Sequence, residues 1–501
     1  MTGPGGTVLS RTGYRVSTGR TAEARPARRL STGEDHVSTA TEQAVAEDHR
    51  NSAPAGASGA SAPAGAAGAT GVGGAGAGDY GAVRALTEAL AAPLSPEDQV
   101  IQSMPDASPA KWHRAHSTWF FETFLLRPHA RGYVPLDERY AYLFNSYYEA
   151  AGPRHPRPQR GLVTRPGVAE VGEYRAHVDA AMGDLLARAG GPLAVPVADL
   201  VTLGLNHEQQ HQELLLMDIK HAFSLNPLDP LYRPRRPPRS GPRLAGDSLA
   251  ATSLAGPGWH EHAGGLEEVG HGGHGFAYDN EGPRHTVYLR PFALAETVVT
   301  CGDWLAFMED GGYRRAELWL SDGWATVQGE AWDAPSYWRR EERDWSQFTL
   351  AGRQQVDPAE PVCHVSYYEA DAFARWSGAR LPTEAEWEVV AAGAQPQPQP
   401  GAQGALDLEV LHPRPAPAGA GMRQLFGDVW EWTSSAYLPY PGFRPAEGAV
   451  GEYNGKFMVN QQVLRGGCCA TPAGHVRASY RNFFPPSARW PFTGLRLARD
   501  L

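Results

Sequence analysis

Residues 197–223 (VADLVTLGLNHEQQHQELLLMDIKHAF) restrict the possible folds of this chain more than any other segment. Apolar residues recur there at helical spacing, and His207 and His211 lie four positions apart. Because residues four apart share one face of a helix, both imidazoles can bind one metal ion. A third histidine from a neighbouring helix would complete a three-nitrogen face and leave the opposite side of the metal open, as catalytic metal sites require. The segment therefore predicts a long helix packed against other helices around a metal centre.

The pentapeptide His207–His211 also allows two other interpretations. HEQQH matches H-E-x-x-H, the pattern of zinc metalloproteases, in which Glu208 would be the general base. A purely structural pair of histidines on a helix fits the same five residues. The pentapeptide alone leaves these alternatives open.

Residues 81–232 are expected to form a helical bundle. The segments HSTWFFETFLL, ERYAYLFNSYYEAA and VAEVGEYRAHVDAAMGDLLARA carry apolar residues at helical spacing, as residues 197–223 do. Before them, AVRALTEALAAPL opens with helix-forming residues and stops at a proline, and SPEDQV then offers a Ser-x-x-Asp start that can cap a helix. Four main helices suggest a bundle, and bundles hold metal sites in their cores between facing helices.

The composition changes three times along the chain. Residues 1–80 are rich in Ala, Gly, Ser and Pro, which predicts a disordered tail without chemistry. Residues 233–258 are rich in Pro, Gly and Arg and predict a linker. Residues 259–501 carry short strand-like runs such as HTVYLRPFALAETVVT, one helical pattern in SYYEADAFARWSG, and a Thr383-x-x-Glu386 cap before a second short helix. This last region is expected to be an α+β domain with much irregular structure.

The net charge and the cysteine content limit the possible binding partners and the cellular compartment of the protein. The net charge of −10 argues against nucleic acid as a partner, because binding to phosphates requires a basic face. No apolar run approaches the length of a membrane span, and no apolar stretch follows the first arginines, so a secretory signal is not expected. Four cysteines in 501 residues, two of them adjacent, favour reduced thiols and a cytoplasmic protein.

Ordered motifs in both halves resemble known families. PVCHVSYYEADAFARWSGARLPTEAEWE, FGDVWEWTSS, LRGGCCA and FTGLRLARD resemble the formylglycine-generating-enzyme, or sulfatase-modifying-factor, domain, which has a C-type-lectin-like fold. HSTWFFETFL and NHEQQHQELLLMDIKH resemble a DinB-like four-helix bundle. The two joined in this order resemble the sulfoxide synthases of ergothioneine biosynthesis, over roughly residues 85–501. The implied fold class is a multidomain α+β protein with an N-terminal bundle.

The resemblance implies a mononuclear non-haem Fe(2+) site held by three histidines. The matching residues are His116, His207 and His211. The nearby His113 is an alternative to His116, which is favoured because it directly precedes the STWFFE motif. His221 lies farther along the same predicted helix, and nothing in the resemblance assigns it to the metal.

The implied reaction is oxidative C–S bond formation. Hercynine and a thiol would be joined at the expense of O2 to give a sulfoxide at the imidazole C2 atom. L-cysteine is the favoured thiol, and γ-glutamyl-cysteine or a selenosugar donor are the alternatives. Since the chain contains no methyltransferase domain, a histidine methyltransferase would supply hercynine, and a C–S lyase would act downstream. A non-catalytic binding module is the non-enzymatic alternative, because both fold types can simply bind ligands.

Two pairs of tyrosines are candidates for the proton donor. NSYYEAAG offers Tyr147 and Tyr148 in the bundle, which the cysteine-using branch of the resemblance favours. SSAYLPYPGF offers Tyr437 and Tyr440 in the C-terminal domain, which the other branch favours. An ordinary half-buried aromatic role is open for each.

The substrates would be bound by arginines and by an aromatic segment. GPRHPRPQRG presents three arginines in a proline-rich loop, where a planar guanidinium suits a carboxylate, although a solvated basic loop is the alternative. Aromatic faces suit the trimethylammonium group of hercynine. The predicted substrate-binding residues are Arg154, Arg157, Arg160, Gln210, Asn482, Phe483 and Phe484.

Phe483 and Phe484 depart from the mycobacterial type of the resembled family, which has a Trp-Asp pair there. The missing carboxylate favours free cysteine over γ-glutamyl-cysteine. The adjacent Cys468 and Cys469 also suggest copper(I), as in formylglycine-generating enzymes, but adjacent cysteines are poorly arranged for two-coordinate linear binding.

Overall fold

The computed structural model describes residues 77–188, 195–234, 258–342, 344–394, 406, 408–445, 451 and 454–501. Most of the predicted tail and residues 235–257 of the predicted linker lie outside these ranges. The first helix begins at Ala77, so the last four residues of the segment expected to be disordered belong to the bundle instead. Tyr80 explains this, because its ring is buried and its hydroxyl donates a hydrogen bond to Asp179. All of the described residues belong to one compact unit.

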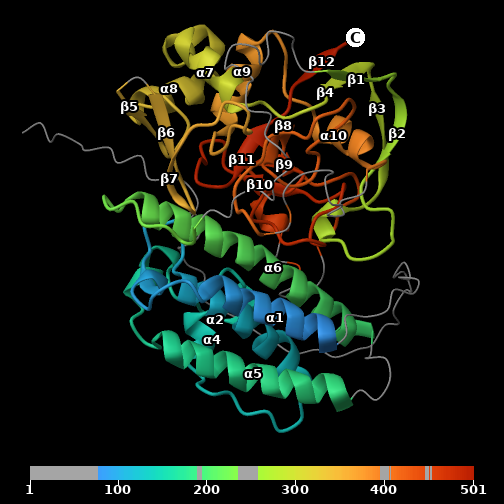
Figure 1. Cartoon of the computed structure of the whole chain (residues 1–501). Coiled ribbons are helices and arrows are strands. Elements are labelled where there is room, and N and C mark those ends of the chain that lie inside the picture. Colours follow the sequence, from blue (N-terminus) through green and yellow to red (C-terminus); the bar gives the residue numbers. More distant parts are fainter. Residues whose placement is uncertain are drawn as a thin grey trace, which may run out of the picture. The chain divides into compact units, whose positions relative to one another are not determined.

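The described residues of the N-terminal part form four long helices (Figure 1). All twelve residues of the helix that carries His116 are buried, so this helix lies inside the bundle. Within the described ranges, none of the helices combines the length and the apolar character that crossing a membrane requires. The four helices are α1 (Ala77–Ala91), α2 (Ala110–Phe121), α5 (Val168–Arg188) and α6 (Val195–Ser224).

Shorter helical turns connect the long helices. Helix α2 continues without a break into a π-helical turn, Glu122–Leu126, and then into α3. The helix predicted for residues 138–151 is wrong: only a single α-helical turn forms there, followed by an irregular segment and a 3₁₀ turn. The connecting elements are η1 (Asp98–Val100), α3 (Arg127–His129), α4 (Tyr140–Leu143), η3 (Glu149–Ala151) and η4 (Arg157–Leu162).

The described residues of the C-terminal part form four small sheets. Strand orders are β1-β4-β12, β10-β9-β8-β11, β2-β3 and β5-β6-β7; all neighbouring strands are antiparallel except β8 and β11. The bounds are β1 Trp259–His262, β2 Gly265–Val269, β3 His285–Leu289, β4 Phe292–Ala295, β5 Trp338–Glu341, β6 Asp344–Thr349, β7 Gly352–Gln355, β8 Trp430–Ala436, β9 Gln462–Arg465, β10 Asn482–Phe484, β11 Thr493–Leu495 and β12 Ala498–Asp500.

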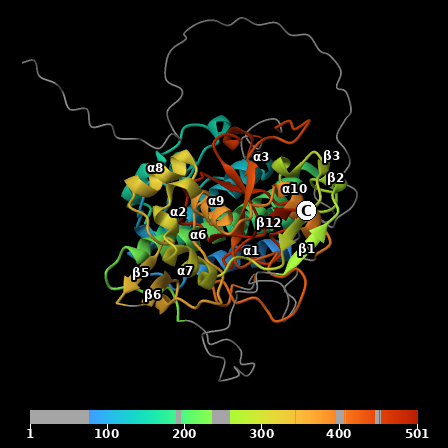
Figure 2. The same ribbon diagram turned by 90° about the horizontal axis from the view of Figure 1, so that it is seen from above.

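Short capped helices surround these sheets. Thr300, Ser366 and Thr383 each form a reciprocal capping box with the acidic residue three positions later, and the box at Thr383 confirms the cap predicted there. Seen from above, β5, β6, α7 and α8 lie on one side of this part, and β1, β2, β3 and α10 lie on the other (Figure 2). The helices are α7 (Cys301–Glu309), α8 (Ser321–Gly329), α9 (Tyr367–Trp376) and α10 (Glu384–Ala391), with 3₁₀ turns η5 (Asp279–Glu281), η6 (Gly312–Arg314), η7 (Ala316–Leu318) and η9 (Gly455–Phe457).

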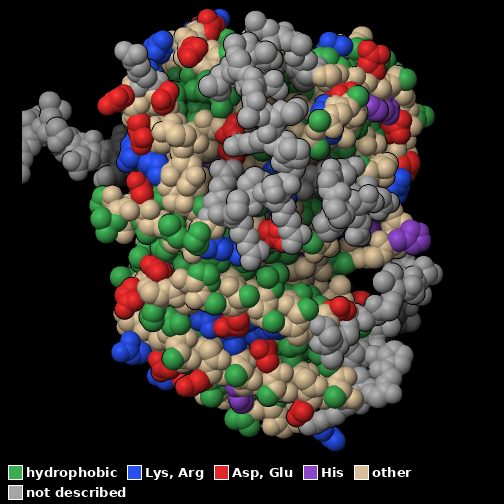
Figure 3. Space-filling view, in the orientation of Figure 1, with side chains coloured by type: hydrophobic (Ala, Val, Ile, Leu, Met, Phe, Trp, Pro, Cys, Tyr) green, Lys and Arg blue, Asp and Glu red, His purple; other side chains and the backbone are tan. Residues whose placement is uncertain are grey.

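Helix α6 carries polar contacts to the C-terminal part. The Glu213 carboxylate accepts hydrogen bonds from Trp430 Nε1 at 2.7 Å and from Thr471 Oγ1 at 2.5 Å. About two turns farther on, Lys220 Nζ lies 2.6 Å from His364 Nε2. These side chains are all buried, so α6 is a shared element of both parts of the unit. On the face shown in Figure 3, the described acidic and basic side chains are intermixed rather than gathered by sign.

Candidate metal centre

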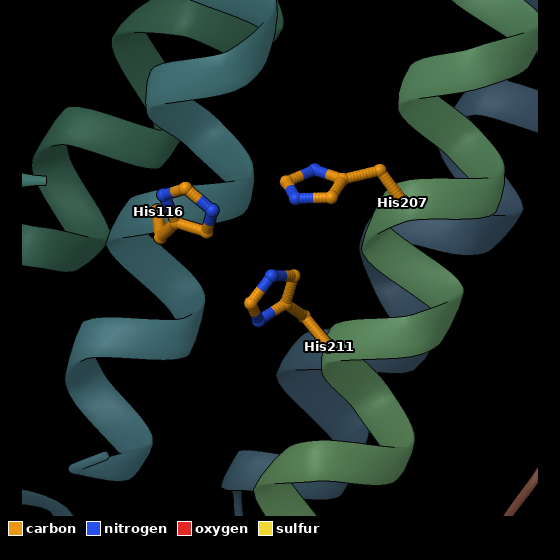
Figure 4. A group of neighbouring side chains, drawn as sticks. All are labelled: His116, His207 and His211. Carbon is orange, nitrogen blue, oxygen red and sulfur yellow. The ribbon is translucent and has the colours of Figure 1, made fainter. Parts of the chain in front are cut away.

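Helices α2 and α6 bring three histidines together. His116 projects from α2, and His207 and His211 project from successive turns of α6 toward it (Figure 4). One nitrogen from each ring lies within 4.8 Å of the others. Among the described residues, this is the one group of three or more His, Cys, Asp or Glu side chains with such spacing. The predicted sharing of a helix face by His207 and His211 therefore leads to a convergent three-nitrogen arrangement.

The ring of His116 is held in a defined orientation. Its Nδ1 atom lies 2.6 Å from the backbone oxygen of Phe144 and therefore carries the hydrogen of that bond. Trp112 and Trp119 stack on either side of the ring, at centroid distances of 4.5 Å and 5.4 Å. The remaining nitrogen, Nε2, is buried without a hydrogen-bond partner. A buried lone pair of this kind fits a metal ligand, since bound metal would satisfy it.

Burial keeps the three imidazoles neutral. It lowers the pKa of His207 to about 3 and holds the pKa of His116 and His211 well below the ordinary value, and the neighbouring histidines depress the last two further. Neutral imidazole is the form that binds metal. The chemistry of the donor set therefore suits a divalent metal ion with positions left for substrates.

His113 is not one of the three convergent histidines. Its Nδ1 atom lies 2.9 Å from Nδ1 of His211, and its Nε2 atom lies 3.1 Å from Oδ2 of Asp218. Both ring nitrogens are thus engaged with protein groups. The geometry favours His116 over His113 as the third candidate ligand.

Glu208 points away from the three histidines. Its buried carboxylate is bonded to Arg84 at 2.9 Å, to Arg175 at 3.0 Å and to Thr87 at 2.7 Å. Although burial by itself raises the pKa of a carboxyl group, the two guanidinium groups outweigh it and lower the pKa of Glu208 to about 2. A carboxylate held in this way is a structural ion-pair partner within the bundle, which removes the basis for the zinc peptidase alternative.

Three of the predicted site residues lie in one aromatic row. Tyr147 contacts Phe457 edge-on at 5.2 Å, Phe457 lies 5.9 Å from Phe483, and Phe483 stacks on Tyr437 at 4.0 Å with nearly parallel rings. Lys456 Nζ lies 4.9 Å from the centroid of the Tyr147 ring and donates to the backbone oxygen of that residue. The row thus joins the loop after α4 to β10 of the C-terminal part.

The four candidate tyrosines have different surroundings. Tyr148 is buried and contacts Trp119, the same indole that stacks on His116. Tyr440 is bonded instead to Arg465 at 2.9 Å and to Glu384 at 3.3 Å. The hydroxyl of Tyr437 accepts a hydrogen bond from Asn280. Tyr440 therefore belongs to an ion-pair network of the C-terminal part, whereas Tyr148 lies against the aromatic wall of the histidine site.

The three arginines of the proline-rich loop also differ. Arg154 is ion-paired with Glu149 at 2.8 Å, and exposed Arg157 donates to the backbone oxygen of Asp106. Arg160 is buried, and its guanidinium lies 3.5 Å from the ring centroid of Trp112, which stacks on His116. Only Arg160 of these three is therefore next to the wall of the histidine site.

The remaining predicted contacts lie on α6 and β10. Gln210 Nε2 donates to the hydroxyl of Tyr480 at 2.7 Å, which fixes its carboxamide beside His211. Asn482 uses its side-chain oxygen to accept from the backbone nitrogen of Phe483. Phe484 packs edge-on against Trp490 at 5.6 Å.

Several residues that contact the predicted site residues were not predicted from the sequence. Trp112 and Trp119 lie four positions before and three after His116, so helical spacing alone places them on its face. Lys456 and Tyr480 had no such signal, because they lie 309 and 270 residues from the side chains that they contact. Contacts over such separations are set by the tertiary fold.

The surroundings of Cys468 and Cys469 do not favour a copper site. All four cysteines are free and buried, and burial raises the pKa of both adjacent thiols well above the ordinary value. Cys468 Sγ accepts a weak hydrogen bond from the backbone N–H of Ala470. A protonated, packed thiol is poorly suited to bind a metal ion.

Known proteins share both parts of this arrangement. Residues 80–215 match the DinB superfamily, and residues 260–407 and 412–501 match the sulfatase-modifying factor enzyme 1-like domain, which confirms the predicted fold class. Hercynine oxygenase of Mycolicibacterium thermoresistibile is 34% identical over 423 residues, which cover 79% of this chain and 88% of that protein. Hercynine oxygenase of Mycolicibacterium smegmatis is 36% identical over 322 residues, 60% of this chain and 71% of that protein. Formylglycine-generating enzyme of Streptomyces coelicolor is 33% identical over 274 residues, 46% of this chain and 84% of that enzyme.

The similarity to the first relative extends over both the bundle and the C-terminal part, whereas the formylglycine-generating enzyme covers less than half of this chain. The chain belongs to the hercynine oxygenase family, a family of oxidoreductase enzymes.

Proposed function

We propose that this protein is an Fe(2+)- and O2-dependent enzyme that joins hercynine to a thiol. The observation that carries the proposal is the convergence of His116, His207 and His211, with nitrogens within 4.8 Å of one another and a buried, unpartnered Nε2 on His116. These three residues would hold the metal. When bound there, Fe(2+) supplies open positions and the redox chemistry that O2 requires.

The proposed reaction balances with one molecule of O2. The C2–H bond of the hercynine imidazole and the S–H bond of the thiol break, and a C–S bond forms between the two atoms. The sulfur is also oxidised to the sulfoxide. Together these changes supply four electrons, so that one oxygen atom enters the sulfoxide and the other leaves as water with the two hydrogens.

Hercynine is proposed to lie between α6 and the aromatic row. Gln210, fixed by Tyr480, would hydrogen-bond the imidazole of the substrate next to His211. The stacked rings of Phe483 and Tyr437 would receive the trimethylammonium group, since aromatic faces attract a quaternary cation. Asn482 on the same strand would contact the carboxylate end.

L-cysteine is the proposed thiol, and Arg160 is its proposed carboxylate partner. The buried Arg160 guanidinium next to Trp112 supports this assignment over Arg154 and Arg157. Position 484 carries a phenylalanine, so it offers no carboxylate to the second ammonium group of γ-glutamyl-cysteine. A buried ammonium group without a partner costs on the order of 1–3 kcal/mol, which predicts a preference for cysteine of about tenfold or more in kcat/KM.

Tyr148 is the proposed proton donor. Its contact with Trp119, the indole that stacks on His116, supports this choice, and the engagement of Tyr440 with Arg465 and Glu384 argues against the latter residue. Tyr148→Phe should lower turnover strongly with hercynine binding kept. Tyr440→Phe should lower the melting temperature and leave the turnover of the folded protein within about threefold.

A product assay tests the proposal. Purified protein is loaded anaerobically with Fe(2+) and given hercynine with cysteine and γ-glutamyl-cysteine together, and the products are identified by mass after O2 is admitted. A cysteine adduct is expected, and none is expected from His116→Ala. Full activity of a zinc-only preparation would exclude the iron chemistry, while a γ-glutamyl adduct as the main product would overturn only the choice of thiol. A seleno-adduct formed from a selenosugar in preference to either thiol would likewise replace the donor.

A further inference from the structure

His113 links a proposed metal ligand to a buried carboxylate. It lies one helical turn before His116 on α2, and its Nδ1 atom is 2.9 Å from Nδ1 of His211. Its Nε2 atom is 3.1 Å from Oδ2 of Asp218, which lies two turns after His211 on α6. His113 and Asp218 are 2% and 5% exposed, so neither water nor an outside partner explains this arrangement.

The direction of these hydrogen bonds follows from the chemistry of the groups. A carboxylate only accepts, so His113 must donate from Nε2 to Asp218. A neutral His113 then has only a lone pair at Nδ1, and His211 must donate from its own Nδ1. This fixes the hydrogen of His211 on Nδ1 and leaves the lone pair on Nε2, the nitrogen that remains for a metal ion.

We propose that Asp218 and His113 are positioning residues that hold His211 in its metal-binding tautomer and orientation. The inference rests on the proposed metal site. Metal-binding histidines usually pass their second N–H to a carboxylate or a backbone carbonyl, which orients the ring and strengthens it as a donor. In this protein the carboxylate acts through one further imidazole.

The chain of bonds is anchored at its far end. The backbone N–H of Ser108, in the turn before α2, donates to the same Oδ2 atom of Asp218 at 2.7 Å. The hydroxyl of Ser108 in turn accepts from Arg160 at 3.0 Å. Asp218 is therefore fixed from two sides and cannot turn away from His113 without breaking a second hydrogen bond.

His116 and His211 differ in the hydrogen-bond partners that hold their rings. His116 donates from Nδ1 to the neutral backbone oxygen of Phe144, whereas the support of His211 ends in a charged carboxylate. Negative charge at the end of a hydrogen-bond chain makes the imidazole a stronger electron donor. His211 is thus expected to contribute more to metal affinity than a histidine held by a carbonyl alone.

Cobalt(II) binding measures this role without any turnover. Metal-free protein is titrated with Co(II) in competition with a coloured chelator, and the visible spectrum of the bound Co(II) is recorded. His113→Phe keeps a planar aromatic ring, slightly larger than imidazole, but removes both hydrogen bonds. We expect it to weaken Co(II) binding roughly 10- to 100-fold and to change the spectrum.

Two further variants separate positioning from packing. In His113→Asn the carboxamide oxygen can take the place of Nδ1 and accept from His211, so it should bind Co(II) about tenfold more tightly than His113→Phe. Asp218→Ala removes the carboxylate at the far end of this series of hydrogen bonds. Because Asp218→Ala and His113→Phe interrupt the same series, the double variant should bind Co(II) only slightly more weakly than His113→Phe alone.

His412→Phe is the matched control. His412 is a buried histidine whose Nε2 lies 2.8 Å from the carboxylate of Glu360 in the C-terminal part, so its loss tests for a general effect of removing such a pair. It should lower the melting temperature and leave Co(II) affinity unchanged. Equal weakening by His412→Phe and His113→Phe would overturn the proposal, and so would equal binding by His113→Asn and His113→Phe.

The same experiment distinguishes a failure of the positioning role of His113 and Asp218 from a failure of the proposed metal site. If His211→Ala abolishes Co(II) binding while His113→Phe and Asp218→Ala both bind as the unmodified protein does, the positioning role is wrong and the metal site stands. If the unmodified protein and His211→Ala behave alike, the proposed metal site is wrong. Should His113→Phe fail to fold, Asp218→Ala and His113→Asn still decide the outcome.

Discussion

At the scale of single residues, neighbours in sequence have opposite roles. His207 and Glu208 are adjacent, but successive residues on a helix point about 100° apart. His207 therefore faces His116, while Glu208 faces Arg84 and Arg175. The H-E-x-x-H pattern describes the spacing of these residues correctly and their chemistry incorrectly.

Glu208→Gln tests this separation. We expect the variant to keep at least a tenth of the turnover per folded molecule, a barrier change within about 1.4 kcal/mol, because Glu208 is not a base. We also expect a loss of about 3 kcal/mol in the free energy of unfolding, since two buried guanidinium groups lose a charged partner. Turnover and urea unfolding of the same preparation measure both effects. A loss of several orders of magnitude in turnover, with metal bound and the fold intact, would support a peptidase-like role.

Arg160 and Arg157 provide a second pair to compare. Arg160→Lys keeps the charge but loses the planar stacking on Trp112 and the two-pronged geometry, so the KM for cysteine should rise by about tenfold with the KM for hercynine nearly unchanged. Arg157→Lys should change neither, because the guanidinium of Arg157 is exposed and donates to the backbone oxygen of Asp106. Steady-state kinetics with each substrate varied in turn distinguishes the two. Equal effects of both variants would exclude the assignment to Arg160.

Part of the histidine site could be predicted from the sequence, and the rest depends on the tertiary fold. The spacing of His207 and His211 requires only a regular helix, so it could be read directly. The choice of Arg160 among three arginines depends on which side chain the loop buries, and local spacing does not encode that. Similarly, the burial of Tyr440 among ion pairs depends on Arg465 and Glu384, which are distant in sequence.

At the scale of elements, residues 138–151 show how a correct pattern can predict the wrong structure. Tyr140, Phe144 and Tyr148 are indeed buried at helical spacing. Asn145, however, donates from its side chain to the backbone oxygens of Tyr148 and Gly152 and accepts from the backbone nitrogen of Tyr148. These bonds replace the helical backbone bonds, as Asn side chains commonly do, so the segment turns instead of continuing as a helix.

Two helical glycines offer a test of how tightly α2 and α6 pack. A Cβ atom at Gly204 on α6 would lie 2.7 Å from Phe121 and 2.9 Å from Phe120 on α2, whereas Gly183 on α5 has open space around it. Gly204→Ala should therefore destabilise the protein by about 1–3 kcal/mol through overpacking. Gly183→Ala should stabilise it by about 0.5–1 kcal/mol through helix propensity.

Thermal and urea unfolding of both glycine variants give the comparison directly. Because α2 carries His116 and α6 carries His207 and His211, Gly204→Ala should also weaken Co(II) binding, and Gly183→Ala should not. Stabilisation by both alanines would show that the phenylalanine rings move aside easily.

At the scale of the whole molecule, buried charges link distant segments. Glu384 on α10 is bonded to Arg465 at 2.8 Å and to Arg481 at 2.8 Å and 3.0 Å. Burial by itself raises the pKa of this carboxyl group, but the two guanidinium groups outweigh it and hold the pKa below the ordinary value. Residues up to 97 positions apart are thereby held together by one carboxylate.

This network predicts how stability depends on pH. Because the pKa of Glu384 is lower in the folded protein, its contribution is complete above the unfolded value of about 4.5 and is lost as the pH falls through the folded value. Glu384→Gln should cost about 3–5 kcal/mol at neutral pH and reduce the acid dependence of unfolding. Glu309→Gln, at an exposed position at the end of α7, should stay within about 0.5 kcal/mol. Urea unfolding from pH 7 to pH 3 measures both, and equal pH dependence of the two variants would contradict the prediction.

The contacts of α6 have a consequence for biosynthesis. Glu213 is bonded to Thr471, 258 residues later, and Lys220 to His364, 144 residues later. At about 5–20 residues per second, the ribosome needs roughly 10 to 50 s to make the chain between Glu213 and its last partner. During that interval the helix that carries two of the three histidines has already left the ribosome with a charged face that lacks its partners from the C-terminal part. The polar contacts that join α6 to the C-terminal part can therefore form only after a further 144 to 258 residues have been synthesised.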